Sequence, residues 1–409
     1  MKVLIVNDEF YPEKVFGPSV IAYNIAKDLQ KRGNEVMVFS SILTPDAPKE
    51  IIFDGLKIYR IISTYNRRYR NYYNVFNRPV VKEFKRVLDQ FRPDVVHFHN
   101  THDGLCYCLF KTAKKFGAKT FLTAHDVMLF VPGKLIEFID KNDYSVKNEY
   151  NYRVTLWQQL KRFKKRFNPF RNLLIRYYLG YVDKIFAVSN ELADALKQNK
   201  ISNVAVIHNG IDLTGWQIDS GLIAGFKEKY RLAGKPVVLY AGRLSPLKGG
   251  RVIIEVMKKV REQITDAALL IVGKSEEYFG LTKSEKDKNW LICTDWISGQ
   301  ELRLAYLSSD LVVVPSVCFD CFPTVNLEAM AAAKPVIATC FGGSGEAVVD
   351  NVTGFIINPL DIKTTAEKVV SLLEDKNLAA KFGQAGFERV KEKFSLARQV
   401  ETILKYYQS

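Results

Sequence analysis

The sequence predicts an α/β protein with two Rossmann-like domains, each a parallel sheet covered by helices. Apolar runs alternate with helical patterns twice along the chain, first from residue 2 and again from residue 236. The length of 409 residues suits two to three average domains, and the 47% apolar content is ample for their cores. Strands that alternate with helices form βαβ units, in which the strands are parallel.

The first domain is predicted to span 1–210. Its opening run, KVLIVN at 2–7, has the composition of a buried strand, and an amphipathic helix at 19–32 ends before Gly33. Further strands are predicted at 35–40, 56–62, 94–98, 119–124 and 184–188, and helices at roughly 79–91, 103–116 and 190–199.

The second domain is predicted to span 211–390. The stretch 208–235 is Gly-rich and polar at its start, which suits a connection between domains. The C-terminal helix predicted at 391–409 is a candidate for packing against the first domain. Strands of the second domain are predicted at 236–241, 268–272, 311–314, 335–338 and 354–357.

Residues 127–182 interrupt the first domain as a basic insertion. The net charge of the chain is +15, and residues 1–210 carry +14 of it. From 150 to 182 no residue is acidic, and the stretch 59–82 repeats this basic and aromatic composition. Four apolar residues recur on one face of a helix predicted in the insertion: Leu156, Leu160, Phe163 and Phe167.

A cationic helix of this kind favours an anionic membrane surface as its partner. The alternative is a solvated face over an ordinary core helix. Nucleic acid is not predicted as a partner, because no recognised RNA-binding motif accompanies the arginines and aromatic residues. An acidic residue follows after only five apolar residues at the start of the sequence, unlike the pattern of a signal peptide. No apolar run approaches the ~20 residues of a spanning helix. These features predict a cytoplasmic protein whose six cysteines are thiols.

Two loop motifs indicate the chemistry. The loop NDEFYPEKVFGPSV after the first strand holds one glycine, which makes nicotinamide binding unlikely, and no Asp-x-Asp metal motif occurs. In AGRLSPLKGG at 241–250, Arg243 and Lys248 flank a turn that leads into a helix, as a diphosphate site requires. In FDCFPTVNLEAM, Asp320 precedes a helix that begins near Pro323, and Glu328 lies about two turns along it. These carboxylates suit sugar and ribose hydroxyls.

At these motifs the chain resembles the retaining nucleotide-sugar glycosyltransferases of family 4, which have the GT-B fold. The resemblance covers nearly the whole chain and includes the loop at Gly17, TAHD with His125, VIHNGID at 206–212 and the block from 315 to 346. Its strongest element is a pair of carboxylates separated by seven residues. The chain departs from the family where Asp320 replaces the first Glu, and it has Pro18 and Ala333 where Gly is usual.

The resemblance implies a role for each site residue. Arg243 and Lys248 would bind the donor diphosphate and stabilise its departure, and Asp320 would hold the donor sugar. His125 would lie over that sugar, and Gly17 would let the backbone approach the phosphate. The nucleoside would be held by Asp295, Trp296, Thr324, Val325 and Glu328, of which Glu328 would bind the ribose diol. The donor would be a UDP-sugar or a GDP-sugar, and neither a metal nor another cofactor would be required.

Cysteine and histidine clusters offer a metal site as an alternative. Cys293, Cys318, Cys321 and Cys340 could bind zinc if three loops converged, and His97, His99 and His102 resemble a second cluster. The favoured interpretation makes the cysteines small buried residues and the histidines packing or cleft-lining residues.

The sequence favours a metal-independent, hexosyltransferase-like enzyme of surface-polysaccharide assembly, peripheral to the inner face of the cell membrane. Its acceptor would be a lipid-linked or membrane-borne glycan. Three alternatives stay open at this point: a nucleotide-sugar epimerase of the same fold, a transferase with a soluble acceptor, and a non-catalytic basic protein that binds membranes or nucleic acid.

Overall fold

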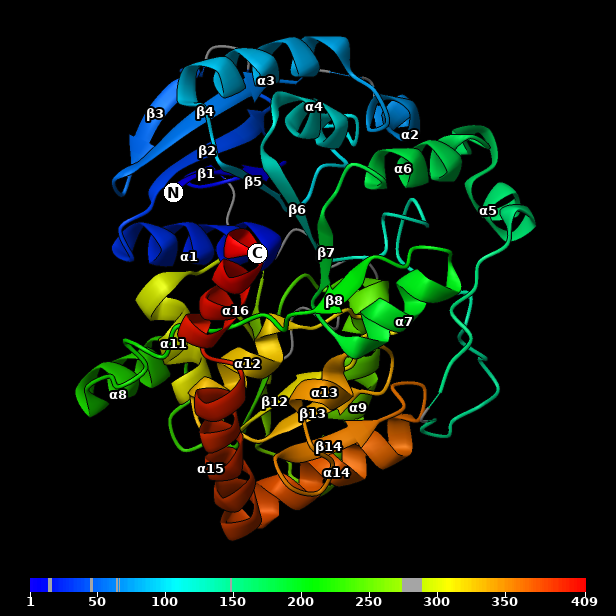
Figure 1. Cartoon of the computed structure of the whole chain (residues 1–409). Coiled ribbons are helices and arrows are strands. Elements are labelled where there is room, and N and C mark those ends of the chain that lie inside the picture. Colours follow the sequence, from blue (N-terminus) through cyan, green and yellow to red (C-terminus); the bar gives the residue numbers. More distant parts are fainter. Residues whose placement is uncertain (14–16, 45–46, 64, 66, 148, 274–288) are drawn as a thin grey trace. The chain divides into compact units, whose positions relative to one another are not determined.

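The computed structural model describes residues 1–13, 17–44, 47–63, 65, 67–147, 149–273 and 289–409. The chain forms two compact units (Figure 1). Unit 1 comprises residues 1–138, 151–210 and 396–409, and unit 2 comprises residues 139–150 and 211–395. Within the described residues, no helix has the length and apolar character that crossing a membrane requires.

Unit 1 is built on an eight-stranded sheet with the order β3-β4-β2-β1-β5-β6-β7-β8. All neighbouring strands pair in parallel except β3 and β4, which form an antiparallel edge pair. The strands are β1 (Lys2–Asn7), β2 (Glu35–Ile42), β3 (Glu50–Phe53), β4 (Leu56–Ile62), β5 (Val95–Phe98), β6 (Lys119–Ala124), β7 (Lys184–Ala187) and β8 (Val204–Val206).

Helices pack on this sheet because their apolar residues recur at helical spacing. In α1 (Gly17–Lys31), Ile21, Ile25 and Leu29 are buried and pack in the same core as Val400 and Ile403 of α16 (Leu396–Gln408). The other helical segments of unit 1 are η1 (Arg67–Tyr69), α2 (Arg70–Tyr73), α3 (Arg78–Phe91), α4 (Leu109–Phe116), α5 (Leu156–Phe163), η2 (Lys164–Arg166), α6 (Arg171–Leu179) and α7 (Asn190–Gln198).

Unit 2 is built on a six-stranded parallel sheet with the order β11-β10-β9-β12-β13-β14. Its strands are β9 (Val237–Ala241), β10 (Ala268–Val272), β11 (Leu291–Cys293), β12 (Leu311–Val314), β13 (Val336–Thr339) and β14 (Gly354–Ile357). Its helical segments are α8 (Ser220–Lys229), η3 (Pro246–Lys248), α9 (Gly250–Gln263), α11 (Gly299–Leu307), α12 (Thr324–Ala331), α13 (Ser344–Ala347), α14 (Ile362–Glu374) and α15 (Lys376–Lys393). The predicted fold class of two parallel-sheet α/β domains is confirmed.

Several predicted boundaries were wrong. The predicted helix at 103–116 begins only at Leu109, because the preceding loop is held to the end of β1 by hydrogen bonds described below. The predicted helical face from Leu156 to Phe167 ends at Phe163, since Lys164 has a φ of 47° and the chain leaves the α-helix there. The helix after Pro323 begins at Thr324, which places Glu328 about one turn along it rather than two.

Two segments belong to a unit other than the one that their sequence position suggested. Residues 139–150, inside the predicted insertion of the first domain, pack in unit 2. Asn358 Nδ2 donates to the backbone carbonyls of Asp143 and Ser145 at 3.0 Å each. Residues 391–393 complete α15 of unit 2, and α16 alone packs in unit 1. Neither assignment follows from local periodicity.

Candidate active site

The predicted donor residues lie on loops at one edge of the unit 2 sheet. These loops follow the carboxyl ends of β9, β12 and β13, and parallel strands present all such ends at the same edge. Gly249, after β9, has a φ of 79°, and a side chain there would clash with the carbonyl oxygen of Pro315, after β12. Gly342, after β13, has a φ of 101° and lies as close to the backbone of Asp320. The sequence therefore brings three loops into contact by means of glycines.

Lys248 and Asp320 form a direct ion pair at the centre of these loops. The Lys248 Nζ atom is 2.6 Å from Asp320 Oδ2, and the Ser316 hydroxyl donates to the same oxygen at 2.7 Å. The Asp320 side chain is only 10% exposed, so the carboxylate would be unfavourable there without these donors. Its backbone is also held, because the Asp320 N–H donates to Phe341 O at 3.0 Å and its carbonyl accepts from Gly343 N at 2.8 Å.

The backbone of the 242–249 loop is held by Tyr240. This buried residue of β9 directs its hydroxyl to the carbonyl oxygens of Arg243 and Lys248, at 2.8 and 3.0 Å. Burial raises the pKa of Tyr240, so the hydroxyl stays protonated as a donor. The Arg243 side chain is exposed. The loop thus fixes the backbone from which both predicted diphosphate ligands project.

Glu328 lies on α12 and is bound by a tyrosine. The Tyr306 hydroxyl, from α11, donates a short hydrogen bond to Glu328 Oε2. Burial raises the pKa of Glu328, and the hydrogen bond from Tyr306 counters part of that effect. Glu328 and Asp320 do not contact each other in the hydrogen bonds of the described residues. Each carboxylate instead has its own hydroxyl donor.

The remaining predicted nucleotide ligands lie near the same edge. Asp295 has a φ of 59° and bridges to Gly273, whose N–H donates to Asp295 O at 3.1 Å. Trp296 follows it, with 45% of its surface exposed. Thr324 and Val325 form the partly exposed first turn of α12. The predicted unit 2 ligands other than Glu328 therefore lie on loops or helix starts that follow the carboxyl ends of the strands, and Glu328 lies one turn along α12.

His125, in unit 1, is hydrogen-bonded to a second histidine. Its Nε2 atom lies 2.8 Å from His99 Nδ1, and the two rings stack with centroids 5.2 Å apart. The ring of His97 lies 4.5 Å from that of His99 and is hydrogen-bonded to Tyr407 of α16, with 2.6 Å between Nδ1 and the hydroxyl. A second hydroxyl, Thr123 Oγ1, lies 2.8 Å from His97 Nε2.

These imidazoles are neutral in the folded protein. Burial lowers the pKa of His125 to about 4 and that of His97 to about 3, and it lowers the pKa of His99 well below its usual range. His99 Nε2 is buried without a hydrogen-bond partner among the described residues. A buried lone pair is tolerated better than a buried N–H without an acceptor. This favours the tautomer in which His99 donates to His125, so that His125 presents an N–H at Nδ1.

The loop after β5 is fastened to the end of β1 by Asp8. Its carboxylate accepts the backbone N–H groups of His102, Asp103 and Leu105 at 2.7, 2.8 and 2.7 Å. Burial nevertheless raises the pKa of Asp8 to about 6. These bonds replace the first turns of the helix predicted from residue 103, and they hold the Asp103 side chain at the carboxyl edge of the unit 1 sheet.

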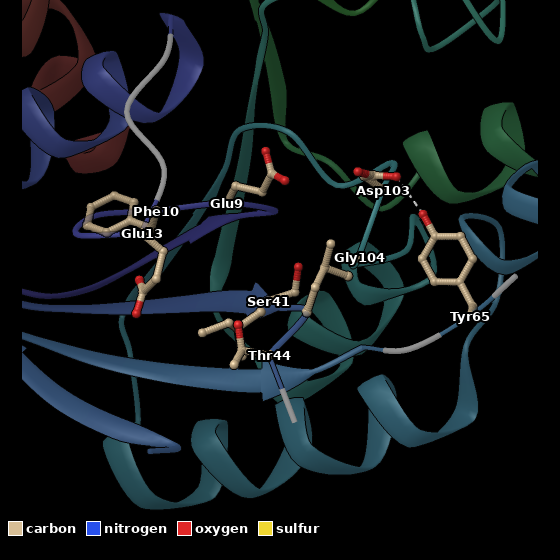
Figure 2. Close-up of a pocket in the computed structure, with 10 residues that line it drawn as sticks. Glu9, Phe10, Glu13, Ser41, Thr44, Tyr65, Asp103 and Gly104 are labelled. Atoms are coloured by element: carbon tan, nitrogen blue, oxygen red, sulfur yellow. Dashed lines mark hydrogen bonds between the residues drawn. The ribbon is translucent and has the colours of Figure 1, made fainter. Parts of the chain in front are cut away.

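A pocket of about 220 Å³ opens beside this loop (Figure 2). The hydroxyl of Tyr65 donates to Asp103 Oδ1 at 2.5 Å, drawn as a dashed line in Figure 2. Its lining joins carboxylates, hydroxyls and aromatic rings, among them Glu9, Phe10, Glu13, Ser41, Thr44, Tyr65 and Asp103. This mixture of acceptors, donors and flat apolar faces suits a sugar ring.

Gly17, the remaining predicted ligand, begins α1. A Cβ atom added there would meet nothing within 4 Å, so packing among the described residues does not demand glycine. The open space leaves room for the expected approach of a ligand to the backbone.

Family models match both halves of the chain. The model described as Glycosyltransferase Family 4 matches residues 16–214, and the model described as Glycosyl transferases group 1 matches residues 225–389. The protein is a glycosyltransferase with the GT-B fold. The fold and the enzyme class predicted from the sequence are both confirmed.

Individual relatives agree with this assignment. YtcC of Bacillus subtilis is 29% identical over 219 residues, which are 50% of this chain and 54% of that protein. The GDP-mannose-dependent alpha-(1-6)-phosphatidylinositol monomannoside mannosyltransferase of Mycolicibacterium smegmatis is 30% identical over 186 residues, which are 43% of this chain and 49% of that enzyme. The chain thus spans about half the length of these relatives. Sucrose-phosphate synthase of Thermosynechococcus elongatus is 20% identical with a TM-score of 0.78, covering 100% of this chain and 98% of that one, which shows a shared fold.

The sequence-based prediction missed four residues that shape this candidate site. Ser316, Tyr240 and Tyr306 hold the predicted ligands, and His99 was ranked only as a packing or cleft-lining residue. The spacing of Ser316 four residues before Asp320 was a usable signal, whereas the two tyrosines looked like ordinary core residues. All six cysteines are free thiols, and in the described part of the chain no three metal-binding side chains converge.

Proposed function

We propose that this glycosyltransferase transfers a sugar, with retention of anomeric configuration, from a UDP-sugar or GDP-sugar to a lipid-linked or membrane-borne glycan. The observation that carries the donor half is the set of Lys248, Asp320 and Ser316 at the carboxyl edge of the unit 2 sheet. The mannosyltransferase relative supports a nucleotide-sugar donor and a lipid acceptor, because its name states both.

The proposed donor chemistry is electrostatic. Arg243 and Lys248 bind the diphosphate and carry the charge that develops as it leaves, so the proposal includes no metal. Lys248 uses one of its three N–H donors on Asp320, which leaves two for phosphate oxygens. Asp320 binds hydroxyls of the donor sugar, and Glu328 binds the ribose diol. Asp295, Trp296, Thr324 and Val325 contact the nucleoside.

Unit 1 supplies the acceptor side in this proposal. His125 lies over the donor sugar and Gly17 faces the phosphate, while the pocket of Figure 2 receives the acceptor glycan. The basic insertion faces an anionic membrane at its cytoplasmic side. In support, Trp157 is 71% exposed on α5 and Phe170 is 65% exposed before α6. Exposed aromatic rings among lysines and arginines are typical of interfacial helices.

Donor binding is tested by thermal unfolding with UDP, GDP, ADP and their sugars. A nucleotide at 100 times its dissociation constant should raise the stability by about 2.7 kcal/mol. One nucleotide should give this shift, and its sugar should then support transfer to a lipid-linked glycan. No shift with any of them contradicts the donor assignment. Transfer to a free oligosaccharide at the same rate as to the lipid-linked one would favour a soluble acceptor instead.

Membrane binding is tested by sedimentation with vesicles that contain phosphatidylglycerol. Each neutralised lysine at the surface should remove about 1 kcal/mol of binding. The protein should leave the vesicles at a lower salt concentration when three lysines are changed together to Gln, namely Lys161, Lys164 and Lys165. Lys381, Lys391 and Lys393, which are exposed on α15 of unit 2, form the charge-matched control. Equal loss in both triple variants, or no binding by the wild type at low salt, contradicts the assigned surface.

A further inference from the structure

A second pocket in unit 1 is lined by arginines. Its volume is about 280 Å³, and Arg68, Arg70 and Arg166 contribute to its wall. Arg68 and Arg70 come from η1 and α2, whereas Arg166 ends η2, almost a hundred residues later in the chain. Pro132 and Phe163 complete the apolar part of the lining. Neither the donor site nor the pocket of Figure 2 accounts for three guanidinium groups at this place.

Hydrogen bonds hold the two arginine-bearing segments together. Asn71 Nδ2 donates to the carbonyl of Arg166 at 2.7 Å, and Asn168 Nδ2 donates to the carbonyl of Asn71 at 2.9 Å. Both asparagines are buried. Arg70 Nη2 donates to Pro132 O at 3.3 Å, which orients its guanidinium against the third wall. The pocket is therefore a built feature of the fold rather than a chance meeting of mobile surface side chains.

The charge of the pocket matches a diphosphate. Three arginines and one carboxylate, Asp103, line it, so its formal charge is +2. Among the described residues, the side chain of Arg166 forms no ion pair, and the side-chain hydrogen bond of Arg70 goes to the carbonyl oxygen of Pro132. A diphosphate substituted at both ends carries two negative charges, and planar guanidinium groups bind its oxygens in pairs.

The surroundings of the pocket match a diphosphate that joins an apolar chain to a sugar. A third pocket, of about 150 Å³, shares Arg70 and Asp103 with the arginine pocket and shares Glu9 and Asp103 with the pocket of Figure 2. The three pockets thus meet around Asp103. The segments that carry the arginines also expose large apolar side chains, namely Tyr69, Tyr72, Tyr73, Phe76, Leu156, Trp157 and Leu160.

We propose that the pocket of Arg68, Arg70 and Arg166 binds the diphosphate of a lipid-diphosphate acceptor. The lipid chain then lies on the exposed apolar side chains of α2 and α5, and the attached glycan enters the pocket of Figure 2 through the shared wall at Asp103. The three carboxylates of that pocket disfavour an acidic sugar there, so its occupant is a neutral or amino sugar. This inference rests on the proposed function, because it identifies the acceptor of that reaction.

The experiment measures diphosphate binding by calorimetry with farnesyl diphosphate, a soluble isoprenoid diphosphate. Arg243→Ala with Lys248→Ala serves as the background, so that the proposed donor site does not contribute. Arg70→Gln with Arg166→Gln should weaken binding by about tenfold per arginine, which is about 1.4 kcal/mol each, because each change removes a charged hydrogen-bond donor. Arg70→Lys with Arg166→Lys should restore part of the affinity, because lysine restores the positive charge but not the paired donors of the planar guanidinium group.

Lys161→Gln with Lys165→Gln is the matched control, because it removes two exposed charges from the same surface but outside the pocket. This variant should bind farnesyl diphosphate as its background does and should bind phosphatidylglycerol vesicles less tightly. Inorganic pyrophosphate should bind more weakly than farnesyl diphosphate, and farnesol should not bind. Equal loss in the lysine and arginine variants would show a diffuse basic surface and would overturn the assigned pocket.

Two results separate this inference from the proposed function. If farnesyl diphosphate binds through Arg70 and Arg166 but no nucleotide sugar supports transfer, the pocket stands and the proposed reaction fails. If the arginine variants bind farnesyl diphosphate like their background while the wild type transfers sugar normally, the reaction stands and the diphosphate assignment is wrong.

Discussion

The carboxyl edges of the two sheets differ in the charge of the groups buried there. In unit 2 a charged pair, Lys248 and Asp320, is kept in place by Ser316 and by glycines that let three loops touch. In unit 1 the buried groups His97 and His99 are neutral, and the positive charge lies on outer helices. Fixed positive charge at the unit 2 edge can stabilise a leaving diphosphate. At the unit 1 edge the neutral histidines occur together with carboxylates that accept hydrogen bonds, Asp8 and Asp103.

The largest expected effect comes from breaking the charged edge. Lys248→Ala should lower kcat about 10²–10³-fold, as the loss of a donor to a developing anion does. Asp320→Asn should abolish transfer while nucleotide binding persists, because Arg243 and Glu328 remain. Turnover and nucleotide binding are measured for both variants. Full transfer by the Asn variant would show that Asp320 does not hold the sugar.

The neutral buried histidines should make unit 1 sensitive to acid. His97 and His99 titrate far below the ordinary value near 6.5, so the stability that they contribute is present above pH 6.5 and is lost as the pH falls. Lowering the pH from 7 to 5 should decrease the free energy of unfolding by about 2 kcal/mol through His97, and His99 should act in the same direction. Urea unfolding at several pH values measures this effect. His97→Gln should flatten the acid slope, and an unchanged slope would contradict the assignment.

Asp8 opposes this trend over part of the range. Because its pKa is raised to about 6, its contribution to stability is present below about pH 4 and is lost as the pH rises through 6. One carboxyl offsets only part of the loss from two histidines. Asp8→Asn should therefore steepen the net acid sensitivity between pH 4 and 6, as long as the loop of residues 102–105 keeps its hydrogen bonds.

A smaller effect on kcat is expected when His99, which orients His125 through a hydrogen bond, is changed. His99→Leu should lower kcat by about tenfold, the equivalent of one hydrogen bond, without changing nucleotide binding. His99→Asn should keep most of the activity, since the amide can occupy the position of Nδ1. The ¹⁵N shifts of His125 report its tautomer directly. Tyr407→Phe is the control, because it removes a hydrogen bond to His97 and leaves His125 untouched. An unchanged tautomer in the Leu variant would contradict the orienting role.

The smallest effect on folding is expected at Gly17. Gly17→Ala should leave stability unchanged or raise it by up to about 1 kcal/mol, because alanine favours a helix and the added Cβ has open space. Transfer should nevertheless fall if the backbone there approaches the donor phosphate. Stability and turnover that both stay at the wild-type level would remove Gly17 from the site.

Local pattern in the sequence was sufficient to predict most strands, and it also marked the candidate site motifs. Short apolar runs such as residues 2–7 and 268–272 can be recognised as buried strands from the sequence, because the pattern that indicates a strand involves residues only a few positions apart. Arg243, Lys248 and Asp320 were also predicted from the sequence as site residues, since each lies between the end of a parallel strand and the start of an α-helix.

Only the tertiary structure decided which of these residues meet. The ion pair of Lys248 and Asp320 spans 72 positions, and the hydrogen bond between His97 and Tyr407 spans 310. The arginine pocket likewise joins segments about 95 positions apart, and residues 139–150 pack in the unit that their position did not predict. Contacts at such separations depend on loop closure and on glycines that admit close backbones, and a periodicity of two or 3.6 residues carries no information about either.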